Sequence, residues 1–150
     1  MCLYRNSDGF SLIELVVALV IVGIVASFAF PSFSESIHAG RRTDAITTLL
    51  QVQLLQEKWR GNHTSYTTTL GGTNCNTLTA TGLCWSGTDS LEGYYSISVV
   101  SSDASSYTIK ASPKSGTAQE GDRCGSFYLN QDGPDYGAAG AADNICWKKS

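Results

Sequence analysis

The 150-residue chain carries little charge and few of the side chains on which catalysis usually depends. Lysine, arginine, aspartate and glutamate make up 15% of it, without a run of like charge, and the formal net charge is −3. A mildly acidic chain does not indicate a general nucleic-acid-binding protein. The two histidines, His38 and His63, have no serine, cysteine or carboxylate at a spacing that suggests a catalytic triad. We therefore expect that the chain is not an enzyme.

Motifs for nucleotides and metals are missing as well. The sequence contains no Walker loop, no G-x-G-x-x-G and no C-x-x-C pair, and both histidines lie far from the cysteines. Asp132-Gly133-Pro134-Asp135 offers oxygen ligands for calcium, but this composition is more typical of a turn. Asn62-His63-Thr64 fits a glycosylation sequon, a three-residue pattern that is common by chance. We expect no cofactor and no metal.

What the chain does have is one long apolar segment, from Phe10 to Phe30. Only Ser11, Glu14 and Ser27 interrupt it with polar side chains. Twenty-one residues at about 1.5 Å each extend roughly 32 Å as a helix, enough to cross the hydrocarbon core of a bilayer. A secretory signal peptide has a shorter apolar region and a small-x-small cleavage site, and a core helix of a soluble protein is apolar on one face only. An ordinary single-span anchor leaves Glu14 unexplained.

The carboxylate of Glu14 needs a partner, since a charge near the centre of a membrane costs about 2.5–3.5 kcal/mol. Cleavage after Gly9 would supply one, because the new α-amine of Phe10 lies one helical turn from Glu14. Gly9, Phe10 and Glu14, with Pro31 at the end of the run, closely resemble the class III signal of type IV prepilins and pseudopilins. In that family a peptidase cuts after the glycine and methylates the new N-terminus. The resemblance therefore implies cleavage between Gly9 and Phe10 and N-methylation of Phe10, although Asp8 stands where a lysine or arginine is common.

One of the five cysteines, Cys2, precedes this cleavage site, and four follow it: Cys75, Cys84, Cys124 and Cys146. Four cysteines allow three pairings, of which Cys75 with Cys84 and Cys124 with Cys146 is the simplest. Disulfides need an oxidising compartment, which places the C-terminal part in the periplasm or outside. The positive-inside rule disagrees, since Arg41 and Arg42 follow the apolar segment and would keep that part in the cytoplasm. We give the cysteines more weight.

Helix-forming residues continue from Arg41 to Trp59, beyond Pro31 and Gly40, which should bend the helix or weaken its hydrogen bonds. Apolar residues there fall on two stripes at helical spacing: Ile46, Leu49, Leu50 and Leu54 on one, and Val52, Leu55 and Trp59 on the other. One stripe would cover a sheet, and the other would suit packing among neighbours in a filament. Alternatively, both stripes are buried within the domain. Arg60-Gly61-Asn62 supplies the helix stop.

Three later segments alternate apolar with polar residues and predict strands at 95–99, 107–111 and 127–129. A turn at 101–105 joins the first two, and residues 131–134 end the third. Residues 62–92 are rich in threonine, glycine and asparagine and predict a loop held by Cys75 and Cys84. The expected fold class is α+β, with a long N-terminal helix packed on an antiparallel sheet of three or four strands and two disulfides.

The second half of the chain is similar to the small PilE-type minor pilins of Gram-negative bacteria. The similarity lies in Asp44-Ala45 to Tyr66, Gly93-Tyr94-Tyr95, residues 124–130 and Cys146-Trp147. It implies the type IV pilin "lollipop" fold, with an exposed and variable segment between the last two cysteines. We expect a prepilin leader (1–9), a membrane-spanning and filament-core helix (10–30), the amphipathic second half of that helix (31–60) and a periplasmic or extracellular head (61–150).

The resemblance favours a structural subunit of a type IV pilus, a minor pilin rather than the major one, with roles in assembly, twitching motility or adhesion. Phe10 and Glu14 would carry assembly. The partners would be other pilins in a helical filament, the prepilin peptidase and the inner-membrane assembly machinery. The chain would first span the inner membrane with its head in the periplasm and then reach the cell surface in the pilus.

Two other functions remain open. One is a type II secretion pseudopilin, whose major forms typically carry a calcium site and lack these disulfides. The other is a DNA-binding pilin for natural transformation, for which a basic patch would be drawn from Lys114, Arg123, Lys148 and Lys149. Solvated surface lysines explain these residues better, so DNA is the less favoured partner.

Overall fold

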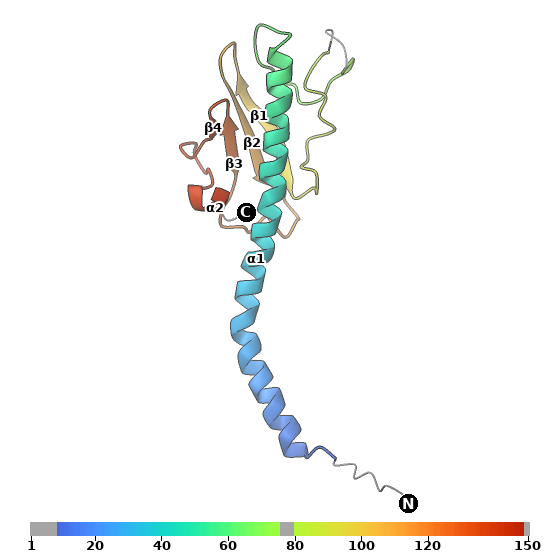
Figure 1. Ribbon diagram of the computed structural model, residues 1–150, viewed down its shortest axis with the longest axis vertical. Coiled ribbons are helices and arrows are strands. Elements are labelled where there is room, and N and C mark those ends of the chain that lie inside the picture. The colour runs from blue at the N-terminus through green and yellow to red at the C-terminus, as the bar shows by residue number, and fades with distance from the viewer. Residues whose placement is uncertain (1–8, 76–79, 149–150) are drawn as a thin grey trace, which may run out of the picture. The chain divides into compact units, whose positions relative to one another are not determined.

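A computed structural model describes residues 9–75 and 80–148 of the protein, with the backbone alone for residues 29–32. The chain forms two compact units, Met1–Ser36 and Ile37–Ser150. Helix α1 (Leu12–Arg60) contributes to both units. The second unit adds the strands β1 (Tyr95–Ser102), β2 (Tyr107–Pro113), β3 (Phe127–Asn130) and β4 (Gly133–Pro134) and the short helix α2 (Asn144–Lys148) (Figure 1).

In the first unit, α1 presents apolar side chains on all its faces. Leu12, Val20 and Phe28 are 82%, 56% and 77% exposed. An 18-residue stretch of α1 has a mean hydropathy of 2.7 with none of it buried, so by length and composition it can cross a membrane. The helix continues through Pro31 and Gly40 without interruption.

The strands of the second unit form one antiparallel sheet in the order β1-β2-β3-β4. Ile97 pairs with Ala111 and Ile109 with Leu129, so alternate residues of neighbouring strands share a face. On that face seven side chains are at most 2% exposed: Tyr95, Ile97, Tyr107, Ile109, Ala111, Phe127 and Leu129. The predicted alternation and the α+β fold are confirmed. Gly133 and Pro134, expected to end the third strand, instead fold back and pair with it as β4.

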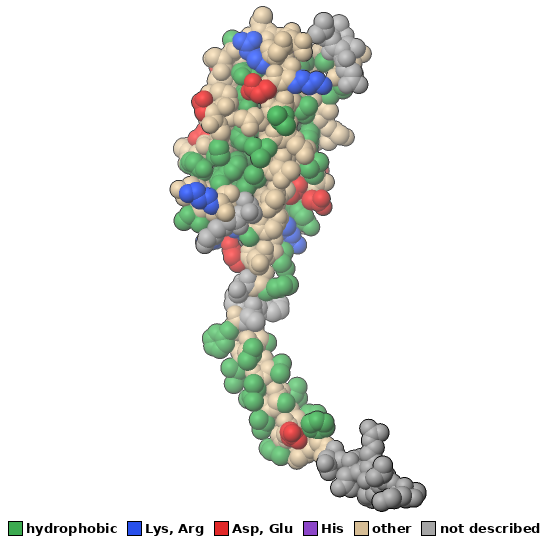
Figure 2. Space-filling view, in the orientation of Figure 1, with side chains coloured by type: hydrophobic (Ala, Val, Ile, Leu, Met, Phe, Trp, Pro, Cys, Tyr) green, Lys and Arg blue, Asp and Glu red, His purple; other side chains and the backbone are tan. Residues whose placement is uncertain are grey.

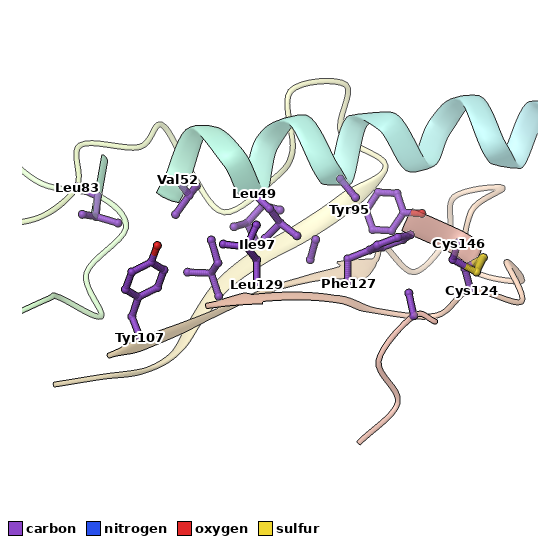
Figure 3. Close-up of a cluster of buried hydrophobic side chains, with 14 residues drawn as sticks. Leu49, Val52, Leu83, Tyr95, Ile97, Tyr107, Cys124, Phe127, Leu129 and Cys146 are labelled. Carbon is purple, nitrogen blue, oxygen red and sulfur yellow. A yellow bond between two sulfur atoms is a disulfide. The ribbon is translucent and has the colours of Figure 1, made fainter. Parts of the chain in front are cut away.

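The part of α1 that follows Ile37 packs on the buried face of this sheet. Leu49 and Val52 project from the helix toward Tyr95, Ile97 and Leu129 (Figure 3). The buried line of α1 therefore takes one residue from each of the two stripes expected from the sequence. Leu50 and Leu54 remain 46% and 70% exposed, so the alternative in which both stripes are buried in the domain is wrong.

The loop between α1 and β1 has no regular secondary structure but contains several backbone hydrogen bonds. The amide of Leu83 donates to the carbonyl of Thr69 (2.9 Å), and that of Trp85 donates to Leu70 (2.8 Å). A Cβ on Gly82 would lie 2.0 Å from the carbonyl oxygen of Gly71, so only glycine fits at this close approach. Residues 69–73 and 81–85 thus form a tight pair of segments beside the end of α1.

Candidate functional site

The junction expected to be processed lies just before α1. Gly9 and Phe10 are both exposed, and no neighbouring atom lies within 4 Å of the place a Cβ on Gly9 would take. The carbonyl of Ser11 accepts the first helical bond, from the amide of Leu15 (3.2 Å). Ser11 and Glu14 also fit the S-x-x-E capping pattern of a helix start. The leader residues Cys2, Arg5 and Asp8 lie outside the described residues.

The structure contains the two expected disulfides, Cys75–Cys84 and Cys124–Cys146. The second one ties the segment before β3 to α2, and Trp147 of α2 packs edge-on against Phe127 with ring centroids 5.4 Å apart. Among the residues that the structure describes, no group of three or more histidines, cysteines or carboxylates is placed to hold a metal ion.

A buried ion pair, which the sequence analysis missed, fastens α1 to the loop between β2 and β3. The Arg42 guanidinium donates to both carboxylate oxygens of Asp122, at 2.8 and 2.5 Å, and both side chains are 1% exposed. Gln119 adds bonds to Asp122 (2.8 Å) and to the Tyr95 hydroxyl (2.9 Å). Burial opposes ionisation of Asp122, but the hydrogen bonds and charge of Arg42 outweigh it and lower its pKa. Arg42 therefore holds the fold together and is not a surface cation.

A second polar contact anchors the loop before β1. Asp44 accepts a hydrogen bond from the Ser90 hydroxyl (2.5 Å) and another from the amide of Glu92 (3.0 Å).

A cavity of about 300 Å³ lies between α1 and the same loop. Beside it, the Arg41 guanidinium sits 4.8 Å from the centre of the Tyr94 ring. Arg41 and Arg42, adjacent in the sequence, thus have different surroundings.

The end of α1 carries a fixed arrangement of rings and cations. The rings of Trp59 and His63 are stacked, with centroids 3.6 Å apart and an interplanar angle of 2°. The indole N–H donates to the carbonyl of Ser65 (3.0 Å), and Nδ1 of His63 bonds to the carbonyl of Trp59 (3.0 Å). Arg60 donates to the carbonyls of His63 (2.7 Å) and Ala104 (3.1 Å). We refer to Lys58, Arg60, Asn62 and His63 as the tip surface.

A cavity of about 210 Å³ opens beside the tip surface. We name it the tip cavity; its lining comes from the end of α1, from Cys75 and from residues 80–84, and Cys75 and Cys84 are joined by a disulfide. Leu83 in this lining is buried, whereas Lys58 and Asn62 are exposed. No local pattern in the sequence predicts this cavity, because its two walls are separated by about 20 residues.

The basic patch considered from the sequence is only partly assembled. The ammonium of Lys114 pairs with Asp89 at 2.5 Å. Arg123 and Lys148 are exposed and lie beside the bridged Cys124 and Cys146, while Lys149 is outside the described residues. Figure 2 shows basic side chains where α1 ends, with an acidic one between them, and others lower on the head, one of them near α2. The cations on this face are thus dispersed.

The remaining sequence candidates lie in turns. Asp135 accepts a bond from the amide of Gly137 (2.9 Å), and the amide of Asp132 donates to the Asn130 side chain (2.9 Å). These bonds are typical of turns. Asn62 and Thr64 of the sequon are both exposed.

An exposed apolar helix, an antiparallel sheet packed on the end of the same helix and two disulfides together define a type IV pilin. Comparison with protein families agrees. Residues 4–30 match the family described as "Prokaryotic N-terminal methylation motif". Residues 31–128, about two thirds of the chain, match "Type IV minor pilin ComP, DNA uptake sequence receptor". The chain belongs to this minor pilin family. A search among curated proteins finds no match.

Proposed function

We propose that the chain is cut between Gly9 and Phe10, methylated on Phe10 and built into a type IV pilus through α1. The match to the methylation motif over residues 4–30 supports this, together with the exposed junction before α1. In the membrane α1 packs against lipid, and in a filament the same apolar surface packs against other pilins. The proposed regions are those expected from the sequence: leader 1–9, membrane and filament helix 10–30, its continuation 31–60 and the displayed part 61–150.

Intact-mass measurement of the membrane-extracted protein tests the processing step. The expected mass lacks the first nine residues and carries one additional methyl group. An uncut chain in cells that process their other pilins would contradict the proposal. A bulkier residue at Gly9 is expected to leave the precursor uncut.

Glu14 is proposed to act when a subunit enters the filament, where its carboxylate meets the N-terminal amine of a neighbour. Glu14→Ala is expected to spare cleavage and membrane residence while reducing the amount of the subunit in sheared pili. Because Glu14 also fits the capping pattern, Glu14→Gln serves as the control. The amide retains a capping side chain but has no charge, so it should fail in assembly as Glu14→Ala does.

We further infer that the displayed part binds DNA. The observation that carries this inference is the match of residues 31–128 to a family described as a DNA uptake sequence receptor. From the sequence, DNA ranked below a purely structural role because the net charge is negative and solvated surface lysines explain the basic residues better. The family match now favours DNA as a partner. Net charge is a property of the whole chain, whereas binding depends on cations that share one accessible surface.

The tip surface is the best-supported place for this contact. Lys58 and Arg60 both lie on the last turn of α1, and the bonds of Arg60 to two carbonyls fix its guanidinium in place. Glu57 and Asp103 lie nearby, so the surface is mixed in charge and is suited to a few phosphates rather than a long track. Arg123 and Lys148 form the second place to test.

DNA capture by intact pili tests the proposed receptor role. Sheared and washed pili from cells that make the chain should retain labelled duplex DNA. Pili of equal mass from cells that lack the chain should retain several-fold less. Equal retention would show that another pilus component binds the DNA.

A further inference from the structure

We propose that one copy of this chain binds a second copy in the pilus, with Ile145 of one copy seated in an apolar groove of the next. The groove is the cavity of about 300 Å³ between residues 40–47 of α1 and residues 91–94 of the loop before β1, and we name it the Leu91 groove. Ile145 lies on α2. This inference rests on the proposed incorporation into a pilus and specifies one contact between its subunits.

The loop wall of the Leu91 groove is ordered before any partner arrives. The amide of Glu92 donates to the Asp44 carboxylate (3.0 Å), and the amide of Leu91 donates to the Thr48 hydroxyl (3.3 Å). These bonds hold the backbone of the loop on α1, yet the side chain of Leu91 remains 56% exposed. A preformed apolar wall limits the entropy that binding must overcome.

The two walls of the groove carry opposite charges. On the α1 wall, the Arg41 guanidinium lies 4.8 Å from the centre of the Tyr94 ring, and Glu92 on the loop wall is exposed. No neighbouring atom lies within 4 Å of the place a Cβ on Gly40 would take, so the groove is open beside this residue. Arginine and tyrosine are enriched among the residues that dominate protein interfaces, and such an apolar centre with a polar rim is typical of an interface.

The surface of α2 has the shape of a small projection with an apolar centre. Ile145 is 50% exposed, whereas its neighbour Cys146 is buried and bridged to Cys124, which fixes the helix on the head. Asp143 before the helix and Lys148 at its end are both exposed. Asp143 also accepts a hydrogen bond from the amide of Cys146 (2.8 Å), so its carboxylate is held in place.

The charges of the two surfaces are complementary. With Ile145 against the apolar groove, Lys148 of one copy pairs with Glu92 of the next, and Asp143 pairs with Arg41. Opposite charges around an apolar centre fix the register of a contact and disfavour other partners. The contact is small, so it acts between subunits that α1 already holds in the filament, where their effective concentration is high.

Within one copy the two surfaces lie apart. Tyr95, next to the groove, Phe127 and Trp147 of α2 form a row of rings, with successive centroids 5.9 and 5.4 Å apart. In Figure 1 the start of β1 and helix α2 lie on opposite sides of α1. A contact between two different surfaces of identical molecules is heterologous and repeats from copy to copy in a helical array. This is the symmetry that a pilus requires.

The contact predicts how the subunit is distributed in the pilus. A minor pilin is by definition less abundant than the major one, and contacts between its copies would place it in runs rather than singly. A run carries several tip surfaces on one stretch of filament, so that one DNA duplex can be held at more than one point.

Carbodiimide treatment of sheared pili tests the contact in the parent chain. This reagent joins a carboxylate to an amine only where the two groups touch. We expect multimers of the chain, in which peptide mapping by mass spectrometry finds Glu92 linked to Lys148. The ion pair of Lys114 with Asp89, at 2.5 Å within one copy, is the internal positive control. Lys148→Gln should reduce the multimers several-fold and leave the control link unchanged.

A pair of cysteines tests the geometry. Pili that carry Leu91→Cys together with Ile145→Cys should give, after oxidation, a ladder of dimers, trimers and larger multimers on a non-reducing gel, because each copy has both halves of the contact. Neither single variant should give a dimer. Val100→Cys with Ile145→Cys is the matched control, since Val100 is 55% exposed but lies on β1 outside the groove, and this variant should remain monomeric.

The outcomes separate this inference from the proposed function. Pili that contain the chain and give the Asp89–Lys114 link without a Glu92–Lys148 link would overturn the contact and leave the proposed function standing. Dimers from a single cysteine variant, which indicate a two-fold contact, or links to a different pilin would also overturn it. If the cysteine variants do not enter pili, carbodiimide treatment of the parent chain decides the matter. Absence of the parent chain from sheared pili would overturn the proposed function itself.

Discussion

At the scale of single residues, the buried pair Arg42 and Asp122 ties α1 to the loop between β2 and β3. Asp122→Ala leaves the buried guanidinium without its carboxylate. We expect a loss of about 3–5 kcal/mol in the free energy of unfolding, measured by urea titration with tryptophan fluorescence. The double variant Arg42→Met/Asp122→Leu removes both charges and should recover most of the loss. A single-variant loss below about 1 kcal/mol would show that the pair contributes little.

Asp103 makes stability depend on pH at the β1–β2 turn. Its carboxylate accepts amide bonds from Ser105 (2.6 Å) and Ser106 (2.7 Å) and bonds from their hydroxyls, which lower its pKa to about 2. A lowered pKa means that this stabilisation is present above the unfolded value of about 3.9 and is lost as pH falls toward 2.

The melting temperature of the parent chain should therefore fall between pH 4 and pH 2. In Asp103→Asn the melting temperature should be lower at pH 7 and fall less steeply over that interval, because only Asp122 and other carboxylates still contribute. Melting curves at half-unit steps of pH test this. Parallel curves for the two proteins would contradict the assignment.

At the scale of elements, α1 has one face that packs on the sheet and one face that is exposed, and residues of the two faces are only a few positions apart in the sequence. Leu54 is 70% exposed, so Leu54→Gln should change stability by less than about 0.5 kcal/mol. If this face contacts neighbouring pilins, the same variant should be depleted from sheared pili. Leu49→Ala is the matched contrast, since Leu49 is fully buried and its truncation should cost about 2–5 kcal/mol. Normal incorporation of Leu54→Gln would exclude this face from the filament contact.

The elements also show what the sequence predicted and why. Tyr95, Ile97 and Ile109 alternate with polar residues, and this local pattern is sufficient to place β1 and β2 and their buried face. The cysteine spacing was enough to favour the observed pairing. The division of α1 into faces was predicted less well, because several helical stripes fit the same apolar residues and only the sheet selects among them.

Contacts between residues that are far apart in the sequence could not be predicted from it. Arg42 and Asp122 are 80 positions apart, and nothing near either residue distinguishes a buried pair from two surface charges. The tip cavity likewise arises only when residues 80–84 lie beside the end of α1. Charge composition alone could not rank DNA as a partner, because it does not show which cations share a surface.

At the scale of the whole molecule, the central proposal is that this minor pilin, processed at Gly9 and anchored by α1, binds DNA through the tip surface. Titration of a labelled duplex with the mature chain in detergent micelles, at salt concentrations between 50 and 200 mM, tests this most directly. We predict a dissociation constant of about 10⁻⁶ M or tighter near physiological salt. With two or three phosphates contacted, the log–log slope with salt should be about −2 to −3. A constant of about 10⁻⁴ M or weaker, at the weak end of non-specific binding, would contradict the proposal.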